Sequence, residues 1–104
     1  MKVTSRDRFE KNPHVVYRGI EDEIILLPTH PRSDSSRQFY FVEGVGREVW
    51  GLLDGNQECQ KIIETIASSF GVEKGKIEKD ILDFIHDLEK EELVRRYDDK
   101  EKKS

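Results

Sequence analysis

The segment from Phe39 to Gly55, FYFVEGVGREVWGLLDG, constrains the fold more than any other part of the chain. Its first residues, Phe39–Val42, are aromatic or β-branched, which favours a half-buried strand. Its later apolar residues follow a helical period and predict a helix over residues 45–53: Val45, Val49, Trp50, Leu52 and Leu53. Asp54-Gly55 then suits a turn at the helix C-terminus. One short segment therefore predicts a strand, a tight corner and a helix.

The residues before this segment predict two further strands, at the apolar runs 15–17 (VVY) and 24–27 (IILL). Gly19–Glu23 separates them and predicts a hairpin turn in which Gly19 takes positive φ. Pro28 ends the second run because proline cannot donate to a strand ladder. The polar segment Thr29–Gln38 predicts a loop that is longer than a tight hairpin needs. It is either a mobile surface connection or a contact for a partner.

The residues after the segment predict two more helices. The first has its apolar residues at Ile62, Ile63, Ile66, Ala67 and Phe70, and Gly71 is placed to cap it. The second begins at Lys76, after a linker over 72–75, and its apolar residues are Ile77, Ile81, Leu82, Phe84, Ile85 and Leu88. A short extended piece is expected at 94–97. Strands followed by helices predict an α+β fold. We expect a three-stranded antiparallel sheet followed by three helices, in a winged-helix-turn-helix-like arrangement.

Length and composition bound the class of protein. A chain of 104 residues suffices for one domain. We expect a flexible N-terminal arm over residues 1–13, in which Phe9 is an anchor, a folded domain over 14–97, and a disordered charged tail over 98–104. One cysteine excludes an internal disulfide, and no apolar run suits a signal peptide or membrane helix. A cytoplasmic protein is therefore expected.

The chain carries no pattern typical of an enzyme or a metal site. His14, His30 and His86 are scattered, and metal binding needs several converging donors. Cys59 lies among apolar helix residues and is expected to be a small buried hydrophobe. Gly44-Val45-Gly46 lacks the remaining residues of a phosphate loop, which favours a tight strand-to-helix corner. We expect no catalytic residues, no metal and no cofactor.

Two features predict a binding surface. The apolar residues of the last helix, Ile77–Leu88, span an arc of roughly 160° bordered by carboxylates. That wide arc is either buried by the other helices and the sheet, or it is in part the floor of an apolar groove. A three-stranded sheet also has an open edge, which can accept a peptide as an added strand or pair with a second chain. The chain is therefore expected to be a monomer or a weak dimer.

A rival hypothesis is a winged-helix protein that acts in transcription by binding DNA or a protein partner. The net charge is −4, from 18 Lys and Arg against 22 Asp and Glu. The last helix is itself rich in carboxylates, which repel phosphates. No nucleic-acid partner is therefore expected, and no membrane partner is expected because no apolar run is long enough for a membrane helix. These residues leave open the alternative that the chain binds a protein partner in transcription.

The chain resembles the PqqD family of RiPP recognition elements, where RiPP means a ribosomally synthesised and post-translationally modified peptide. The resemblance covers about residues 14–97 and rests on the aromatic strand, on Gly46-x-x-x-Trp50-x-Leu52-Leu53-Asp54-Gly55, on Ile62-Ile63 and on Asp80-Ile81-Leu82 with Phe84. It departs from the family at Glu43, where Asn is frequent, at Glu58, where Thr is frequent, and in its longer 29–38 loop.

The resemblance implies a non-enzymatic, winged-helix-like adaptor. Such proteins bind the leader of a precursor peptide and deliver it to a modifying enzyme, a radical SAM enzyme or a leader peptidase. In the family the leader adds as a strand to the third strand and lies against the third helix. Carried onto this chain, the peptide-binding residues are Phe39, Tyr40, Phe41 and Val42 on the strand, and Ile77, Asp80, Ile81, Phe84, Asp87 and Leu88 on the helix.

Overall fold

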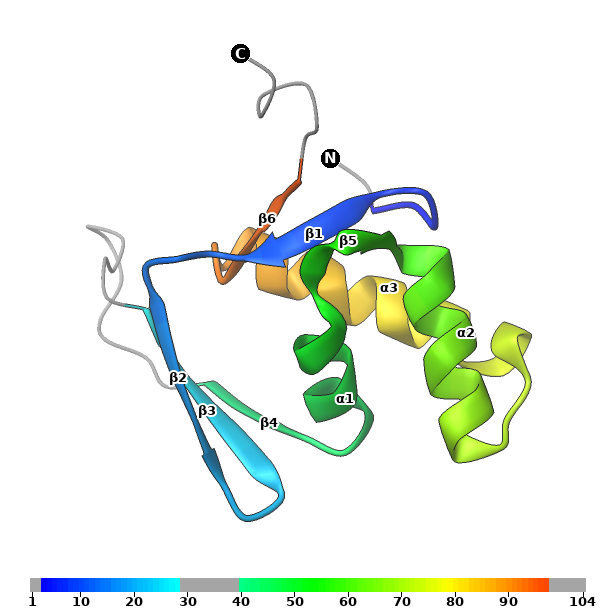
Figure 1. The fold of residues 1–104 in the computed structure, drawn as a ribbon, viewed down its shortest axis with the longest axis horizontal. Helices are drawn as coiled ribbons and strands as arrows, with labels where there is room; N and C mark the ends of the chain where they lie inside the picture. The colour runs from blue at the N-terminus through cyan, green and yellow to red at the C-terminus, as the bar shows by residue number, and fades with distance from the viewer. Residues whose placement is uncertain (1–2, 29–39, 98–104) are drawn as a thin grey trace.

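The computed structural model describes residues 3–28 and 40–97, which form two three-stranded sheets and three helices (Figure 1). The elements in chain order are β1 Arg8–Lys11, β2 Val15–Ile20, β3 Glu23–Pro28, β4 Tyr40–Glu43, α1 Val45–Leu52, β5 Asp54–Glu58, α2 Cys59–Phe70, α3 Lys74–Lys90 and β6 Val94–Arg96. The predicted α+β class, with a three-stranded antiparallel sheet and three helices, is confirmed. The winged-helix label is not confirmed.

The first sheet has the strand order β2-β3-β4, and both pairs are antiparallel. Its three strands are those predicted from the apolar runs. The β2-β3 turn differs from the prediction, because pairing continues through Gly19↔Ile24 and Ile20↔Glu23. The turn therefore falls on Glu21 and Asp22, and the residue with positive φ (54°) is Glu21 and not Gly19. Within the described residues, β4 pairs with β3 alone and is an edge strand.

The second sheet, with the order β5-β1-β6, was not predicted. The flexible arm expected over residues 1–13 is wrong for its described part, because β1 forms the central strand and Phe9 is 1% exposed. The expected turn at Asp54-Gly55 is instead the start of β5. The predicted extended piece at 94–97 is confirmed as β6, which pairs with β1. The expected 98–104 tail lies outside the described residues, as does the loop over 29–38.

The three helices pack on the sheets around one core (Figure 1). Gly71 ends α2 in the left-handed conformation, as predicted, and its N–H donates to the carbonyls of Ala67 and Ser68. Helix α3 begins at Lys74, so the predicted 72–75 linker is shorter than expected. Trp50 of α1 is the largest fully buried side chain. The Tyr17 ring of β2 packs edge-on against the Trp50 ring, with 5.4 Å between the ring centroids. This contact joins the first sheet to α1.

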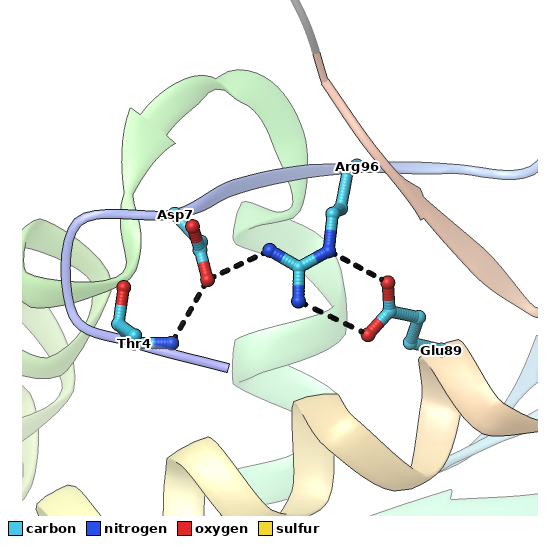
Figure 2. Close-up of polar contacts among 4 residues, drawn as sticks. All are labelled: Thr4, Asp7, Glu89 and Arg96. Atoms are coloured by element: carbon cyan, nitrogen blue, oxygen red, sulfur yellow. Dashed lines mark hydrogen bonds and ion pairs between the residues drawn. The ribbon is translucent and has the colours of Figure 1, made fainter. Parts of the chain in front are cut away.

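Arg96, in the last strand of the second sheet, connects three segments that are far apart in the sequence (Figure 2). Arg96 Nη1 donates to Asp7 Oδ2 at 2.8 Å, and Arg96 Nε donates to Glu89 Oε2 of α3 at 2.9 Å. The backbone N–H of Thr4 donates to the same Asp7 oxygen at 2.9 Å. Because β6, α3 and the N-terminal segment meet in this network, the second sheet fixes where the end of α3 lies.

Within the described residues, no helix combines the length and apolar character that a membrane crossing requires. The same residues contain no group of three or more His, Cys, Asp or Glu side chains that could hold a metal ion. Cys59 is fully buried at the start of α2. Burial, with the nearby Asp7 charge, raises the pKa of its thiol from 9.0 to about 12, so a thiolate nucleophile is disfavoured.

Candidate functional site

A groove with a cavity volume of about 400 Å³ lies between the edge strand β4, the start of α1 and one face of α3. Its lining residues come from these three elements: Phe41, Val42, Glu43, Val45, Gly46, Val49, Ile77, Asp80, Ile81 and Phe84. Strand β4 and helix α3 are far apart in the sequence, and α1 bridges them at the bottom of the groove. The site is thus assembled by the fold and not by one motif.

The floor of the groove is apolar and its rim is acidic. Val42, Val49 and Ile81 are buried, and Ile77 and Phe84 are half-buried beside them. The exposed carboxylates Glu43 and Asp80 lie in the lining on the β4 side and the α3 side. Such a hollow offers apolar contact area to a ligand in its depth and polar contacts at its mouth.

Two glycines shape the groove. Gly44 has φ 62° and ψ −132°, a conformation that L side chains rarely adopt, and it turns the chain sharply from β4 into α1. Gly46 lies at the meeting point of the three elements. A Cβ at Gly46 would lie 3.0 Å from Val42 Cγ1 and 3.2 Å from Phe84 Cζ. The missing side chain therefore lets β4, α1 and α3 approach closely, and it leaves the Phe84 ring its place in the groove wall.

Polar contacts hold the two walls of the groove. The Tyr40 hydroxyl of β4 donates to Glu91 Oε1, just beyond α3, at 2.7 Å. Two residues earlier, Glu89 of α3 accepts the hydrogen bond from Arg96. The end of α3 is thereby tied both to the edge strand and to the second sheet. The spacing between β4 and α3 is set by these ties together with the packed floor.

Comparison with known proteins agrees with this architecture. The family model described as coenzyme PQQ synthesis protein D (PqqD) matches residues 23–94, which run from β3 to the start of β6 and include the whole groove. The chain belongs to the PqqD family. The resemblance drawn from the sequence is therefore confirmed. No curated protein sequence matches the chain.

A solved structure shares the PqqD-family fold of this chain. It is TbiB1 in complex with the TbiA(beta) leader peptide, and it superposes with a TM-score of 0.70 at 26% sequence identity. The match covers 83% of this chain and 94% of that chain.

Six of the residues predicted to bind peptide line the groove of this PqqD-family chain: Phe41, Val42, Ile77, Asp80, Ile81 and Phe84. Of the other four, the three that the structure describes do not belong to its lining. Tyr40 ties β4 to Glu91, Leu88 is buried in the core, and Asp87 is exposed on α3. Phe39 lies outside the described residues. The wide apolar arc of α3 thus has both of the roles that the sequence left open, since Ile85 and Leu88 are core while Ile77 and Phe84 face the groove.

Four lining residues were missed as site residues: Glu43, Val45, Gly46 and Val49. The sequence assigned them to the strand-to-helix corner and to the core. One signal was available, because a helix that follows an edge strand through a tight corner must lie beneath that edge. The groove floor therefore comes from the same residues that turn the chain.

Two further hollows occur among the described residues. A larger one, of about 800 Å³, lies on the opposite side of α3, and it is lined by Val3 and Leu82 together with Gly75, Glu78, Lys79, Asp83 and His86. Another, of about 370 Å³, lies over α1 and α2. Neither is lined by β4, so neither offers a ligand the hydrogen-bonding groups of that strand edge. The β4–α3 groove combines an apolar floor with the edge, which makes it the candidate site.

Proposed function

We propose that this PqqD-family chain is a peptide-binding adaptor. It recognises the leader segment of a ribosomally made precursor peptide by β-strand addition to β4, and it presents that leader to a modifying enzyme, a radical SAM enzyme or a leader peptidase. The observation that carries the proposal is the groove itself, with a strand edge along one side and an apolar helix face along the other. The structural relative TbiB1 was solved with a leader peptide, which supports the same ligand class.

The short length of β4 determines how the affinity for a leader is divided between main-chain hydrogen bonds and side-chain contacts. Its four residues alternate in direction, so about two of them present N–H and C=O groups to an added strand. The resulting bonds, about four in number, contribute about 0.5–1.5 kcal/mol each and carry no sequence preference. Specificity must come from the side chains of the peptide, which alternate between the groove and the opposite face. We expect apolar side chains at alternate leader positions, where they meet Ile77, Ile81 and Phe84.

Calorimetric titration with the leader of a precursor encoded beside this chain tests the proposal. Binding tighter than about 100 µM is expected, and an absence of heat at that concentration rejects the proposal for that leader. Phe41→Ala should weaken binding by about tenfold, since it removes an aromatic side chain from the groove edge. Phe70→Ala is the matched control, because Phe70 is an exposed phenylalanine at the end of α2, away from the groove. Equal losses in the two variants would contradict the site.

A further inference from the structure

The sheet β2-β3-β4 has a second face, directed away from the helices. Strand pairing defines which residues share it, because directly paired residues point to the same side. Val16 pairs with Leu27 in one row; Arg18, Ile25 and Phe41 form the next; Ile20, Glu23 and Glu43 form the last. The intervening residues Leu26 and Val42 are buried against the core, so these rows constitute the outer face.

This outer face is unusually apolar for an exposed surface. Its apolar side chains are Val16, Ile20, Ile25, Leu27 and Phe41, and they are contiguous across the three strands. Val16 is 55% exposed, Ile20 47% and Phe41 65%, so water contacts much of each. An antiparallel sheet with one face on a core normally alternates apolar inward with polar outward. A contiguous apolar face of this kind marks a surface that another molecule covers.

The charges on the outer face indicate which molecule covers it. Arg18 lies on β2, at one edge, while Glu43 lies on β4, at the other edge, one row further along. A two-fold interface brings the same patch of both copies together, so it must complement itself. A two-fold axis that lies between two such sheets and follows β3 puts β2 of each copy over β4 of the other. Arg18 then lies over the Phe41 ring of the second copy and next to its Glu43.

We infer that a second copy of this chain packs on the outer face, sheet against sheet, to form a two-fold dimer. This arrangement stabilises the interface at both the β2 edge and the β4 edge of the sheet. Each guanidinium gains an aromatic ring and a carboxylate, and each Phe41 side chain loses its exposure to water. Phe41 and Glu43 also line the groove, so the dimer covers the β4 rim of the groove, while the groove floor at Val49 and Ile81 lies on the opposite side of the sheet.

The size of the face sets the strength of the dimer. Three strands are roughly 14 Å wide and six residues are roughly 20 Å long, which gives a footprint well below the roughly 800 Å² per partner of a stable complex. The two Glu23 side chains also approach each other near the axis, which opposes association. The dimer is therefore weak, and its population depends on protein concentration.

Sedimentation velocity over about 20 µM to 1 mM tests the dimer. The average mass is expected to rise from the monomer value of 12.2 kDa by at least about half at the highest concentration. Ile20→Lys should keep the chain monomeric, whereas Val72→Lys, at another exposed apolar residue, should leave the rise unchanged. A wild-type chain that stays monomeric at 1 mM, or equal effects of the two variants, overturns the inference.

A charge exchange tests the two-fold geometry directly. Arg18→Glu and Glu43→Arg should each reduce self-association by about tenfold, because each puts like charges together at both edges. An equimolar mixture of the two variants should associate again, since each edge then pairs opposite charges. Glu23→Gln should strengthen the wild-type dimer by about threefold. Failure of the mixture to associate overturns the two-fold packing.

Dimerisation and leader binding can be distinguished with a single variant. Ile20 lies on β2, two strands away from the leader-binding edge, so Ile20→Lys should bind the leader with unchanged affinity. Loss of dimerisation with leader binding retained supports the inference. Loss of both in Ile20→Lys places the two partners on one surface and overturns it.

Discussion

The two sheets of this protein are built in opposite ways. The sheet β2-β3-β4 uses strands that follow one another in the chain and that are rich in apolar residues. The sheet β5-β1-β6 brings together short polar strands from the beginning, middle and end of the described chain. The first sheet offers surfaces to other molecules, namely an edge, a groove wall and an outer face. The second sheet has edges at β5 and β6 but contributes no residue to the groove lining; it locks the N-terminal segment and the end of α3 onto the core.

Binding and stability therefore depend on different sheets in this small domain. Phe9 and Arg96 of the second sheet hold α3 in place, and α3 is the far wall of the groove. Phe41 of the first sheet is largely exposed and holds nothing in place. Substitutions in the second sheet should therefore change stability first, and substitutions on the first sheet should change binding first.

Of the substitutions considered, Phe9→Ala should destabilise the protein most. Phe9 is the one fully buried side chain of β1, and the Arg96 guanidinium lies 5.1 Å from its ring centroid. Removing the ring leaves a cavity between the second sheet and the core, which costs about 3–5 kcal/mol of the free energy of unfolding. Urea denaturation followed by circular dichroism measures this loss. Phe70→Ala, at an exposed phenylalanine, should change stability by less than about 0.5 kcal/mol.

A stability of Phe9→Ala within about 1 kcal/mol of wild type would show that the second sheet does not secure the core. Leader binding should respond differently from stability. At a temperature where Phe9→Ala is still folded, its leader affinity should remain within about threefold of wild type, since Phe9 does not line the groove.

A middle-sized effect is expected for Gly46→Ala, which lies where the two roles meet. The added methyl group would press on Val42 Cγ1 at 3.0 Å and on Phe84 Cζ at 3.2 Å. Overpacking of this kind costs about 1–3 kcal/mol, and movement of the Phe84 ring should also weaken leader binding. Gly51→Ala is the matched control in the same helix. No atom lies within 4 Å of its Cβ position, so it should stabilise the chain by up to about 1 kcal/mol.

Thermal unfolding and leader titration of both glycine variants separate the two contributions. A Gly46→Ala variant that is as stable as Gly51→Ala and binds the leader normally would show that the Phe84 ring moves aside at no cost in free energy. In that case the close approach of β4, α1 and α3 would not define the groove.

The sequence predicts the first sheet well and the second sheet poorly for one physical reason. An apolar run such as 24–27 predicts a strand from the local sequence alone, because a strand with one buried face needs apolar residues. RFEK and DGNQE contain a single large apolar residue between them, so their strand state depends on partners far away in the chain. Glu10, for example, pairs with Arg95. Such pairing is decided by the tertiary structure and leaves no periodic signal.

The groove was predicted in the same uneven way. Its α3 wall followed from the helical period, and its β4 edge followed from the strand run together with the family resemblance. The floor did not follow, because Gly46 and Val49 carry core and corner patterns that are equally compatible with complete burial. The turn residue Glu21 was missed for a similar reason, since Gly19 satisfied the local preference while strand register decided the outcome.

The smallest expected effect concerns the pH dependence of the second sheet. Burial alone would raise the pKa of Asp7, but the hydrogen bonds from Thr4 and Arg96 outweigh it and hold the pKa below 3.8. The folded-state pKa is therefore lower than the unfolded one, so the stabilisation is present above the unfolded pKa and is lost as the pH falls through the folded value.

Asp7→Asn should lower stability by about 1 kcal/mol at pH 7, because a charged hydrogen-bond partner of Arg96 is lost. Between about pH 5 and pH 2 the difference between wild type and Asp7→Asn should vanish. Glu48→Gln, at an exposed carboxylate 3.8 Å from Arg47, is the control, and it should run parallel to wild type over that range. A constant gap between wild type and Asp7→Asn down to pH 2 would show that packing, and not the Asp7 charge, accounts for the contribution of this corner of the second sheet.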